Sequence, residues 1–276
     1  MEIKDILVFL EAGAPCEARL DLARTLAQRF GAVVSGLCAS PEPAMDFADS
    51  YVIGPAAVGE TLAHRQAAIA RLIEPTEAAF RAGLAAGGCD CSWEAATPNT
   101  SPRDLALEAR FFDLAILRRP DAGDSPNRQL AELAALASGT PCLFTPEPAP
   151  AASGFDHVVL AWNGRREAKR ALDDSLTFMK AAARVTVVIA DGEASAEADP
   201  APLMRHLGRH GISAGLERFH AVSEDAGSVL LRACVALDAD LLVMGAYGHS
   251  RSAELVLGGA TRTVLAEAPL PVLMSH

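Results

Sequence analysis

The chain of 276 residues has few aromatic residues, few cysteines and a shortage of basic charge. Phe, Trp and Tyr make up 5% of it, and 24 Lys and Arg stand against 35 Asp and Glu, for a net charge of −11. Proteins that bind duplex nucleic acid usually present a basic face, so this balance argues against a nucleic-acid partner. A small anion site built from backbone N–H groups stays open, because it does not depend on net charge.

The six cysteines are too sparse for a disulfide framework in a chain of this length. There is no Cys-x-x-Cys pair and no histidine cluster near a cysteine, so we expect free thiols and no metal site. No apolar run approaches the ~18 residues of a membrane helix, and the start MEIKDILVFL lacks the basic region of a signal peptide. The sequence therefore predicts a soluble, cytoplasmic protein that does not enter a membrane.

Three short segments occur twice in the same order, which indicates an internal duplication. The matching pairs are DILVFLE and HVVLAWN, FDLAIL and ADLLVM, and TPCLF and LPVLM. Between the copies, the stretch PEPAPAASG at 146–154 has the composition of a linker. We therefore expect two domains, at residues 1–148 and 154–276.

Strand-like and helix-like segments alternate within each half. Apolar strands such as LLVM have no polar face, which is typical of a parallel sheet covered by helices on both sides. Right-handed crossovers then predict two tandem, doubly wound, Rossmann-like α/β domains with five parallel strands each. In the second half we expect strands at 156–162, 184–190, 213–221, 240–246 and 271–275, and helices at 166–182, 200–210, 224–237 and 251–267. The first half adds an insertion at 41–59, which we expect to be a loop or lid.

Glycines follow the penultimate strand of the second half, at the edge of the sheet where open α/β folds bind ligands. Gly245 and Gly248 would break the strand and allow backbone conformations closed to other residues. Gly258 and Gly259 interrupt a helical pattern, at a cost of about 1–2 kcal/mol relative to alanine. If the segment GGAT at 258–261 opens the last helix, its free N–H groups form a phosphate cradle. Each glycine alone fits a turn or a close helix contact as well, but their combined spacing favours a ligand.

The order Gly, two residues, Gly, nine residues, Gly and a small residue resembles the nucleotide-binding signature of the universal stress protein family. The resemblance extends over the chain as the tandem, two-domain form of that family, although only the second half carries the signature. It implies an adenine nucleotide, ATP or AMP with or without Mg²⁺, in the C-terminal domain. The residues placed at the nucleotide are Ala161, Trp162, Asn163, Ile189, Met244, Gly245, Gly248, His249, Gly258, Gly259, Ala260 and Thr261.

The resemblance also implies individual roles. Asn163 stands where the family has an Asp beside the adenosine, so it keeps an acceptor but lacks the charge. Ile189 and Met244 would line the adenine, while Trp162 would either stack on the base or block the pocket. His249 would either neutralise phosphate or belong to a solvated loop. Gly259 replaces the Ser or Thr common after the third glycine, so one hydroxyl contact is missing.

The first half departs from the signature. After its penultimate strand it reads RRPDAGDSP at 118–126, and no glycine pair follows at the expected distance. The two prolines lack N–H donors, and the two aspartates would repel phosphate. We expect this half to bind no nucleotide and to bury a face against the second half as its pseudo-symmetric partner. The chain would then be a monomer or a homodimer of tandems.

Three functions are compatible with these observations. The leading one is a stress-response module that binds an adenine nucleotide and is not an enzyme, with at most weak ATPase activity. The second is an ATP hydrolase of the related adenine-nucleotide hydrolase-like group, whose members carry an SGGxDS loop where this chain reads WNGR at 162–165. The third is a nucleotide-free interaction scaffold. His206 and His210 have the i, i+4 spacing of a metal pair, but no third ligand is evident and a surface helix is favoured.

Overall fold

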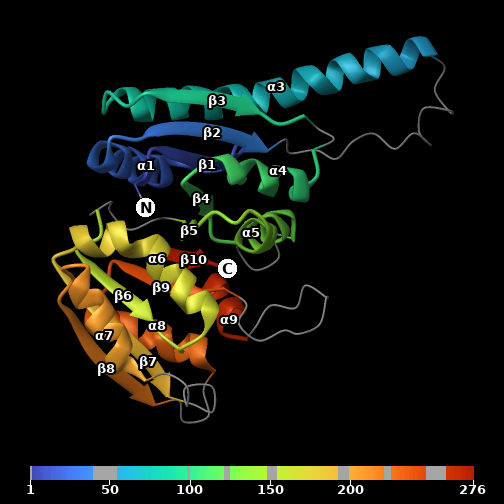
Figure 1. Ribbon diagram of the computed structural model, residues 1–276. Helices are drawn as coiled ribbons and strands as arrows, with labels where there is room; N and C mark the ends of the chain where they lie inside the picture. Colours follow the sequence, from blue (N-terminus) through green and yellow to red (C-terminus); the bar gives the residue numbers. More distant parts are fainter. Residues whose placement is uncertain are drawn as a thin grey trace.

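The computed structural model describes residues 2–39, 55–97, 100–120, 125–147, 154–191, 199–220, 225–246 and 259–276. These residues form one ten-stranded sheet with the strand order β3-β2-β1-β4-β5-β10-β9-β6-β7-β8 (Figure 1). The strands are β1 (Asp5–Glu11), β2 (Val33–Ala39), β3 (Cys91–Ala95), β4 (Leu114–Arg118), β5 (Cys142–Thr145), β6 (His157–Ala161), β7 (Arg184–Asp191), β8 (Ala214–His220), β9 (Leu241–Gly245) and β10 (Val272–Ser275).

Each half of the chain contributes five parallel strands in the same relative order, as the duplicated segments predict. The helices are α1 (Glu17–Phe30), α3 (Pro55–Ala85), α4 (Pro102–Glu108), α5 (Ser125–Ala137), α6 (Arg166–Ala181), α7 (Pro200–Arg209), α8 (Ala226–Leu237) and α9 (Gly259–Glu267), with a 3₁₀ turn at Ala109–Phe111. The predicted fold class, α/β with two tandem sets of five parallel strands, is confirmed.

Helices cover both faces of the sheet and enclose two apolar cores. One core lies under α1, α3, α6 and α7, and the other lies under α4, α5, α8 and α9. Along β9, Val243 belongs to the first core and Met244 to the second, because successive side chains of a strand point to opposite faces. The continuous apolar strands therefore fill both cores at once.

The two halves meet edge to edge, because β5 and β10 pair antiparallel with Leu143 opposite Leu273. The first half thus packs against the second through a shared sheet edge, with Phe30 of α1 also packed on Phe178 of α6, and not by stacking of sheet faces. Every residue of β5 and of β10 is buried, so an unpaired edge at either strand would leave backbone groups without partners. Since the seam is antiparallel, the carboxyl ends of the two sets of strands lie at opposite edges of the sheet.

Arginines strengthen this seam from both faces of the sheet. Arg29, at the end of α1, donates to the carbonyls of Gly154 and Ala181, and Arg119 donates to those of Leu265 and Ala266. Three of these carbonyls lie at the ends of α6 and α9, where the negative end of the helix dipole attracts a cation. The first half therefore holds two helices of the second half by their C-terminal ends.

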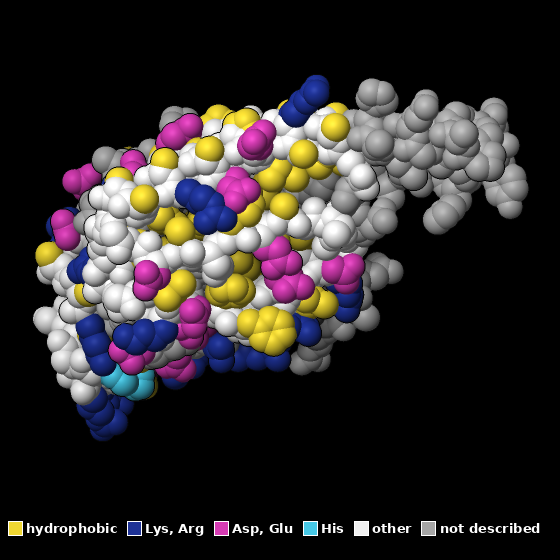
Figure 2. Space-filling view, turned by 90° about the horizontal axis from the view of Figure 1, so that it is seen from above, with side chains coloured by type: hydrophobic (Ala, Val, Ile, Leu, Met, Phe, Trp, Pro, Cys, Tyr) yellow, Lys and Arg dark blue, Asp and Glu magenta, His cyan; other side chains and the backbone are white. Residues whose placement is uncertain are grey.

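The insertion expected as a loop at 41–59 is partly helical. Residues 40–54 lie outside the described residues, but α3 begins at Pro55, so the expectation is wrong for 55–59. Proline suits the first turn of a helix, where its missing N–H would have no partner. Figure 1 shows α3 running past the ends of β2 and β3. Figure 2 looks onto the side of the molecule that carries α3 and β3, where the described side chains of both charges are interspersed with apolar ones.

Candidate functional site

The expected site lies at the carboxyl ends of β6, β7 and β9, which are neighbours in the sheet. Leu160 of β6 pairs with Val243 of β9, so Ala161, the last residue of β6, lies beside Met244, the last residue but one of β9. On the other side of β6, the Trp162 N–H donates to the Val188 carbonyl at 2.9 Å. The order β9-β6-β7 therefore brings together the three strand ends that the sequence singled out.

The side chains at these strand ends divide between the two faces of the sheet. Ala161 and Met244 belong to the α8/α9 face, where both side chains are buried in one core with Val264 and Leu265 of α9. Trp162 packs against the core on the α6/α7 face, and its Nε1 is enclosed without a hydrogen-bond partner among the described residues. Ile189 is fully buried. The indole therefore neither fills nor covers the space beside Met244.

Asn163 begins the turn that leads into α6. Its Oδ1 accepts from the Arg165 N–H at 3.1 Å, while Gly164 between them adopts a φ of +77°. This is the local bond by which Asn side chains commonly organise turns before helices. The acceptor of Asn163 is thus used within the chain, and its amide NH₂ remains the group that the turn does not employ.

Gly245 ends β9 directly beneath the first turn of α6. A Cβ atom at this position would lie 2.5 Å from the carbonyl carbon of Glu167 and 2.6 Å from the nitrogen of Ala168. Its φ is not among the positive values, so the glycine is required by close packing and not by an unusual backbone conformation. Gly245 therefore ends the strand as expected, and the close helix contact that was the alternative for each glycine accounts for it, because the atoms that exclude a side chain are those of a helix.

The start of α9 is the part of the expected phosphate cradle that the structure describes. Gly259 is the first residue of the helix and is exposed, and no atom of the described residues lies within 4 Å of the position its Cβ would take. Ala260 is half-buried and Thr261 is buried. Gly248, His249 and Gly258 lie outside the described residues. Among the described residues, nothing therefore adjoins the Cβ position at the first residue of α9, and Thr261 lies on the inner side of its first turn.

A neighbouring helix start supports α9, and the sequence analysis missed it. A Cβ on Gly227 would lie 2.7 Å from the Ala260 carbonyl oxygen, so the first turns of α8 and α9 are in contact. Asp225 caps α8 by accepting from the Gly227 N–H at 2.8 Å and from the Ser228 hydroxyl at 2.7 Å. The pattern Asp-x-Gly-Ser before an apolar helix is an N-cap signal that could have identified this support.

Burial alone would raise the pKa of the Asp225 carboxyl, but hydrogen bonds from Ser228, Gly227 and Thr263 lower it below the usual value of 3.8. Because the folded-state pKa is the lower one, the ionised carboxylate stabilises the fold above pH 3.8, and this contribution is lost as the pH falls through the folded value. Asp225→Ala is expected to cost about 0.5–2 kcal/mol at neutral pH.

The measurement is the melting temperature of wild type and Asp225→Ala at several pH values. We expect the difference between them to be largest above about pH 5 and to shrink below the usual pKa of an Asp. A difference that stayed constant down to strongly acid pH would contradict a role for the charge.

The end of β10 completes the rim of the site. The Ala246 N–H donates to the Ser275 carbonyl at 2.8 Å, and the His276 Nδ1 lies 3.0 Å from the Ala246 carbonyl oxygen. Glu167 is buried nearby and pairs with Arg166 at 2.5 Å. Burial would raise the pKa of Glu167, but Arg166, the helix backbone and the charge of His276 lower it. Both backbone polar groups of Ala246 are therefore engaged, one by Ser275 and the other by His276.

The equivalent place in the first half is occupied by charged side chains. By the duplicated segments, Glu11 stands at the position of Asn163 and Arg118 at that of Gly245. Arg19 is fully buried on α1, and its Nη2 lies 2.9 Å from Glu11 Oε2 and its Nη1 donates to the Phe9 carbonyl at 2.6 Å. Arg118 Nε approaches Glu11 Oε1 at 3.8 Å.

A fourth charged group and a groove lie beside this cluster. Burial raises the pKa of Glu147, although Arg19 and Arg118 oppose the shift. The groove, of about 400 Å³, lies between the loop at 13–17 and α3, where the Gly13 N–H donates to the Thr76 hydroxyl at 3.2 Å. The strand ends that correspond to those of the expected site in the second half are thus joined by ion pairs in the first.

Comparisons with known proteins agree with this architecture. The model of the universal stress protein family matches residues 154–276. The C-terminal half belongs to the universal stress protein family. No curated protein matches the sequence.

Solved structures extend the fold of a universal stress protein to the whole chain. One from Archaeoglobus fulgidus is similar over 98% of this chain and 97% of its own, with a TM-score of 0.73 and 14% identity. A protein described as a universal stress protein from Pseudomonas aeruginosa is similar over 99% and 93%, with a TM-score of 0.63 and 17% identity. At these identities the likeness shows the fold alone, and a two-domain form fits the length of the chain.

Two further findings concern the described residues only. None of the helices they form is both long and apolar enough to cross a membrane. Within the same ranges, no group of three or more His, Cys, Asp and Glu residues is arranged to hold a metal ion. The rings of His206 and His210 lie 4.6 Å apart on α7, and burial together with the charge of His210 lowers the pKa of His206.

Proposed function

We propose that the C-terminal half binds an adenine nucleotide, ATP or AMP, and that the protein acts as a nucleotide-binding stress-response module without a catalytic role. The observation that carries the proposal is the start of α9 at Gly259, on the same edge of the sheet as the ends of β6 and β9. Among the described residues nothing adjoins the Cβ position of Gly259, and the helix dipole adds partial positive charge at this end of the helix. Membership of the universal stress protein family in this half supports the same function.

The adenine would lie toward Ala161 and Met244, on the α8/α9 face of the sheet. Both side chains are apolar and belong to the same core as Val264 and Leu265 of α9, which is the kind of wall that suits a flat aromatic base. The Asn163 amide would donate to the ribose or the base, since only its Oδ1 is engaged by Arg165. Trp162 and Ile189 would then support these strand ends from behind without touching the ligand.

We propose further that residues 1–148 are a degenerate domain of the same kind, which binds no nucleotide. The supporting observation is the ion-pair cluster of Glu11, Arg19 and Arg118 at its strand ends. Arg118 replaces a glycine against which a helix packs in the other half. A nucleotide entering there would have to separate buried charges, which costs several kcal/mol.

Gly259→Val is the variant that tests the phosphate cradle. Because no atom of the described residues lies within 4 Å of the added Cβ, the described fold has room for the side chain, which would stand beside the amides proposed to hold phosphate. We expect it to weaken ATP binding by about tenfold or more, through loss of charge-assisted bonds to phosphate. The measurement is isothermal titration calorimetry with ATP and with AMP.

The matched control is Gly208→Val on α7, where the Cβ position is also open, and it should bind as wild type does. Equal affinity of wild type and Gly259→Val would refute the cradle, and absence of any ATP binding by wild type would favour a nucleotide-free scaffold. ATP turnover with Mg²⁺ well above background would favour the hydrolase instead.

A further inference from the structure

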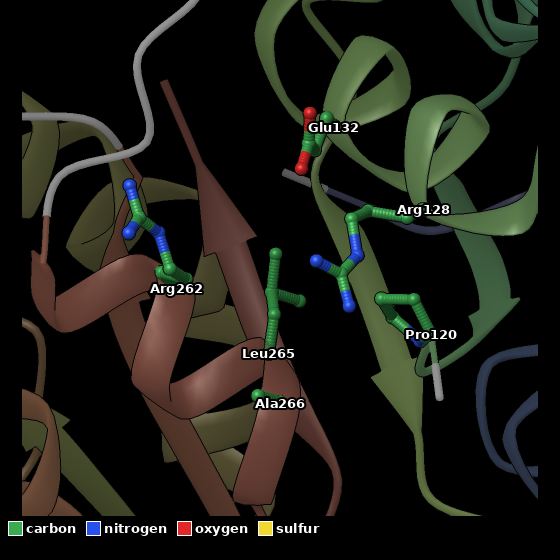
Figure 3. Close-up of a pocket in the computed structure, with 6 residues that line it drawn as sticks. All are labelled: Pro120, Arg128, Glu132, Arg262, Leu265 and Ala266. Atoms are coloured by element: carbon green, nitrogen blue, oxygen red, sulfur yellow. The ribbon is translucent and has the colours of Figure 1, made fainter. Parts of the chain in front are cut away.

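A small cavity of about 30 Å³ lies between α5 of the first half and α9 of the second. Figure 3 shows the Arg128 side chain extending from α5 toward Leu265, with Pro120 beside it, while Arg262 stands on α9 at the opposite side. Glu132 lies further along α5, and Ala266 completes the lining. The cavity thus has an apolar floor and one arginine from each half of the chain.

Neither arginine has a carboxylate within ion-pair distance among the residues that the structure describes. Burial raises the pKa of Glu132, because it outweighs the attraction of Arg128 and Arg262, as expected when neither guanidinium pairs closely with the carboxylate. The nearby Arg119 is engaged, since it donates to the Leu265 carbonyl at 3.2 Å and to that of Ala266. Both Arg128 and Arg262 are exposed and carry charge that a ligand can use.

The position of this cavity within the duplication is informative. Helices α5 and α9 each end five residues before the last strand of their half, at Ala137 and Glu267. Counting back from these ends places Arg128 at the position of Gly258 and Glu132 at that of Arg262. The first half therefore carries a guanidinium where the second carries its glycine cradle, and α9 supplies the opposite wall.

We propose that this junction binds a single oxyanion group of the phosphate class, held by Arg128 and Arg262. The planar guanidinium matches two oxygens of such a group. The cavity volume of about 30 Å³ corresponds to roughly two water molecules, so it admits two oxygens of an oxyanion whose other atoms stay outside, and it does not admit a nucleoside. The site differs from the proposed nucleotide site in its first-half residues, Pro120 and Arg128, although Arg262 follows Thr261 directly on α9.

The test is calorimetric titration of the full chain with inorganic phosphate at low ionic strength. We expect Arg128→Ala and Arg262→Ala each to weaken binding by about tenfold, since each removes a charge-assisted contact. Glu132→Gln should tighten phosphate binding by a few-fold, because it removes a negative charge that repels the anion. A residue with only a structural role would not give this gain in affinity. Arg205→Ala, at an exposed position of α7 on the other face of the sheet, should bind phosphate as wild type does.

Two comparisons keep the result specific. Phosphate could also occupy the start of α9, so Gly259→Val is titrated in parallel and should leave this binding unchanged. Loss of phosphate binding in Gly259→Val, with retention in both arginine variants, would assign the signal to the cradle and overturn the proposal. The proposal would also be overturned if wild type gave no heat of binding at about 10 mM phosphate. This concentration exceeds the dissociation constant of about 1 mM that is typical of a weak site.

Discussion

Arg19→Ala is expected to lower the free energy of unfolding by about 3–5 kcal/mol, which is the usual cost of removing one partner of a buried ion pair. The Arg19 side chain is 0% exposed and that of its partner Glu11 is 22% exposed. The substitution removes the donor to Glu11 and to the Phe9 and Pro15 carbonyls, so the remaining carboxylate keeps only the more distant Arg118.

Urea denaturation followed by circular dichroism measures this change. The control is Arg81→Ala, since Arg81 pairs with Glu77 at 2.7 Å on the surface of α3, and exposed pairs contribute about 0–1 kcal/mol. The double variant Arg19→Met with Glu11→Gln should recover part of the loss, because no uncompensated charge is left. Equal costs for Arg19→Ala and Arg81→Ala would contradict the burial argument.

Gly245→Ala is expected to destabilise the protein by about 1–3 kcal/mol or more, as overpacking of a tight contact does. The added carbon would lie 2.5 Å and 2.6 Å from backbone atoms of Glu167 and Ala168. Backbone atoms within a helix cannot rotate aside, so α6 would have to move away from β9. The measurement is again the free energy of unfolding, with the melting temperature as a second readout.

Gly208→Ala on α7 is the matched control, because nothing lies within 4 Å of its Cβ position. Alanine there should stabilise the protein by about 0.5–1 kcal/mol, since it reduces the conformational entropy of the unfolded chain. If Gly245→Ala were as stable as wild type, the packing account of Gly245 would fail. Because this glycine holds the fold, lost nucleotide binding in Gly245→Ala would not identify a ligand contact, which is why Gly259 is the better probe.

Most elements of the second half were predictable from local pattern. The strand expected at 184–190 is Arg184–Asp191, and the helix expected at 166–182 is Arg166–Ala181. Strands buried on both faces and helices between turn residues leave strong signals, because each depends on neighbours in sequence. The part of the last helix expected at 251–258 lies outside the described residues.

The contacts that decide the candidate site were less accessible. The packing of Gly245 against Glu167 joins residues far apart in sequence, and no local pattern announces such a contact. The face occupied by Trp162 was predictable, since it shares the two-residue alternation of Val158 and Leu160. The buried Arg19 was not, because charged residues in a first helical turn usually face solvent.

The antiparallel seam between β5 and β10 joins two halves of one polypeptide. Two separate chains that met in this way would come apart on dilution, whereas a covalent tether keeps the partner at an effective concentration in the millimolar range. The association of the two halves then does not depend on the protein concentration. Each half is also free to change its strand ends without altering a symmetric copy, as the contrast between Arg118 and Gly245 illustrates.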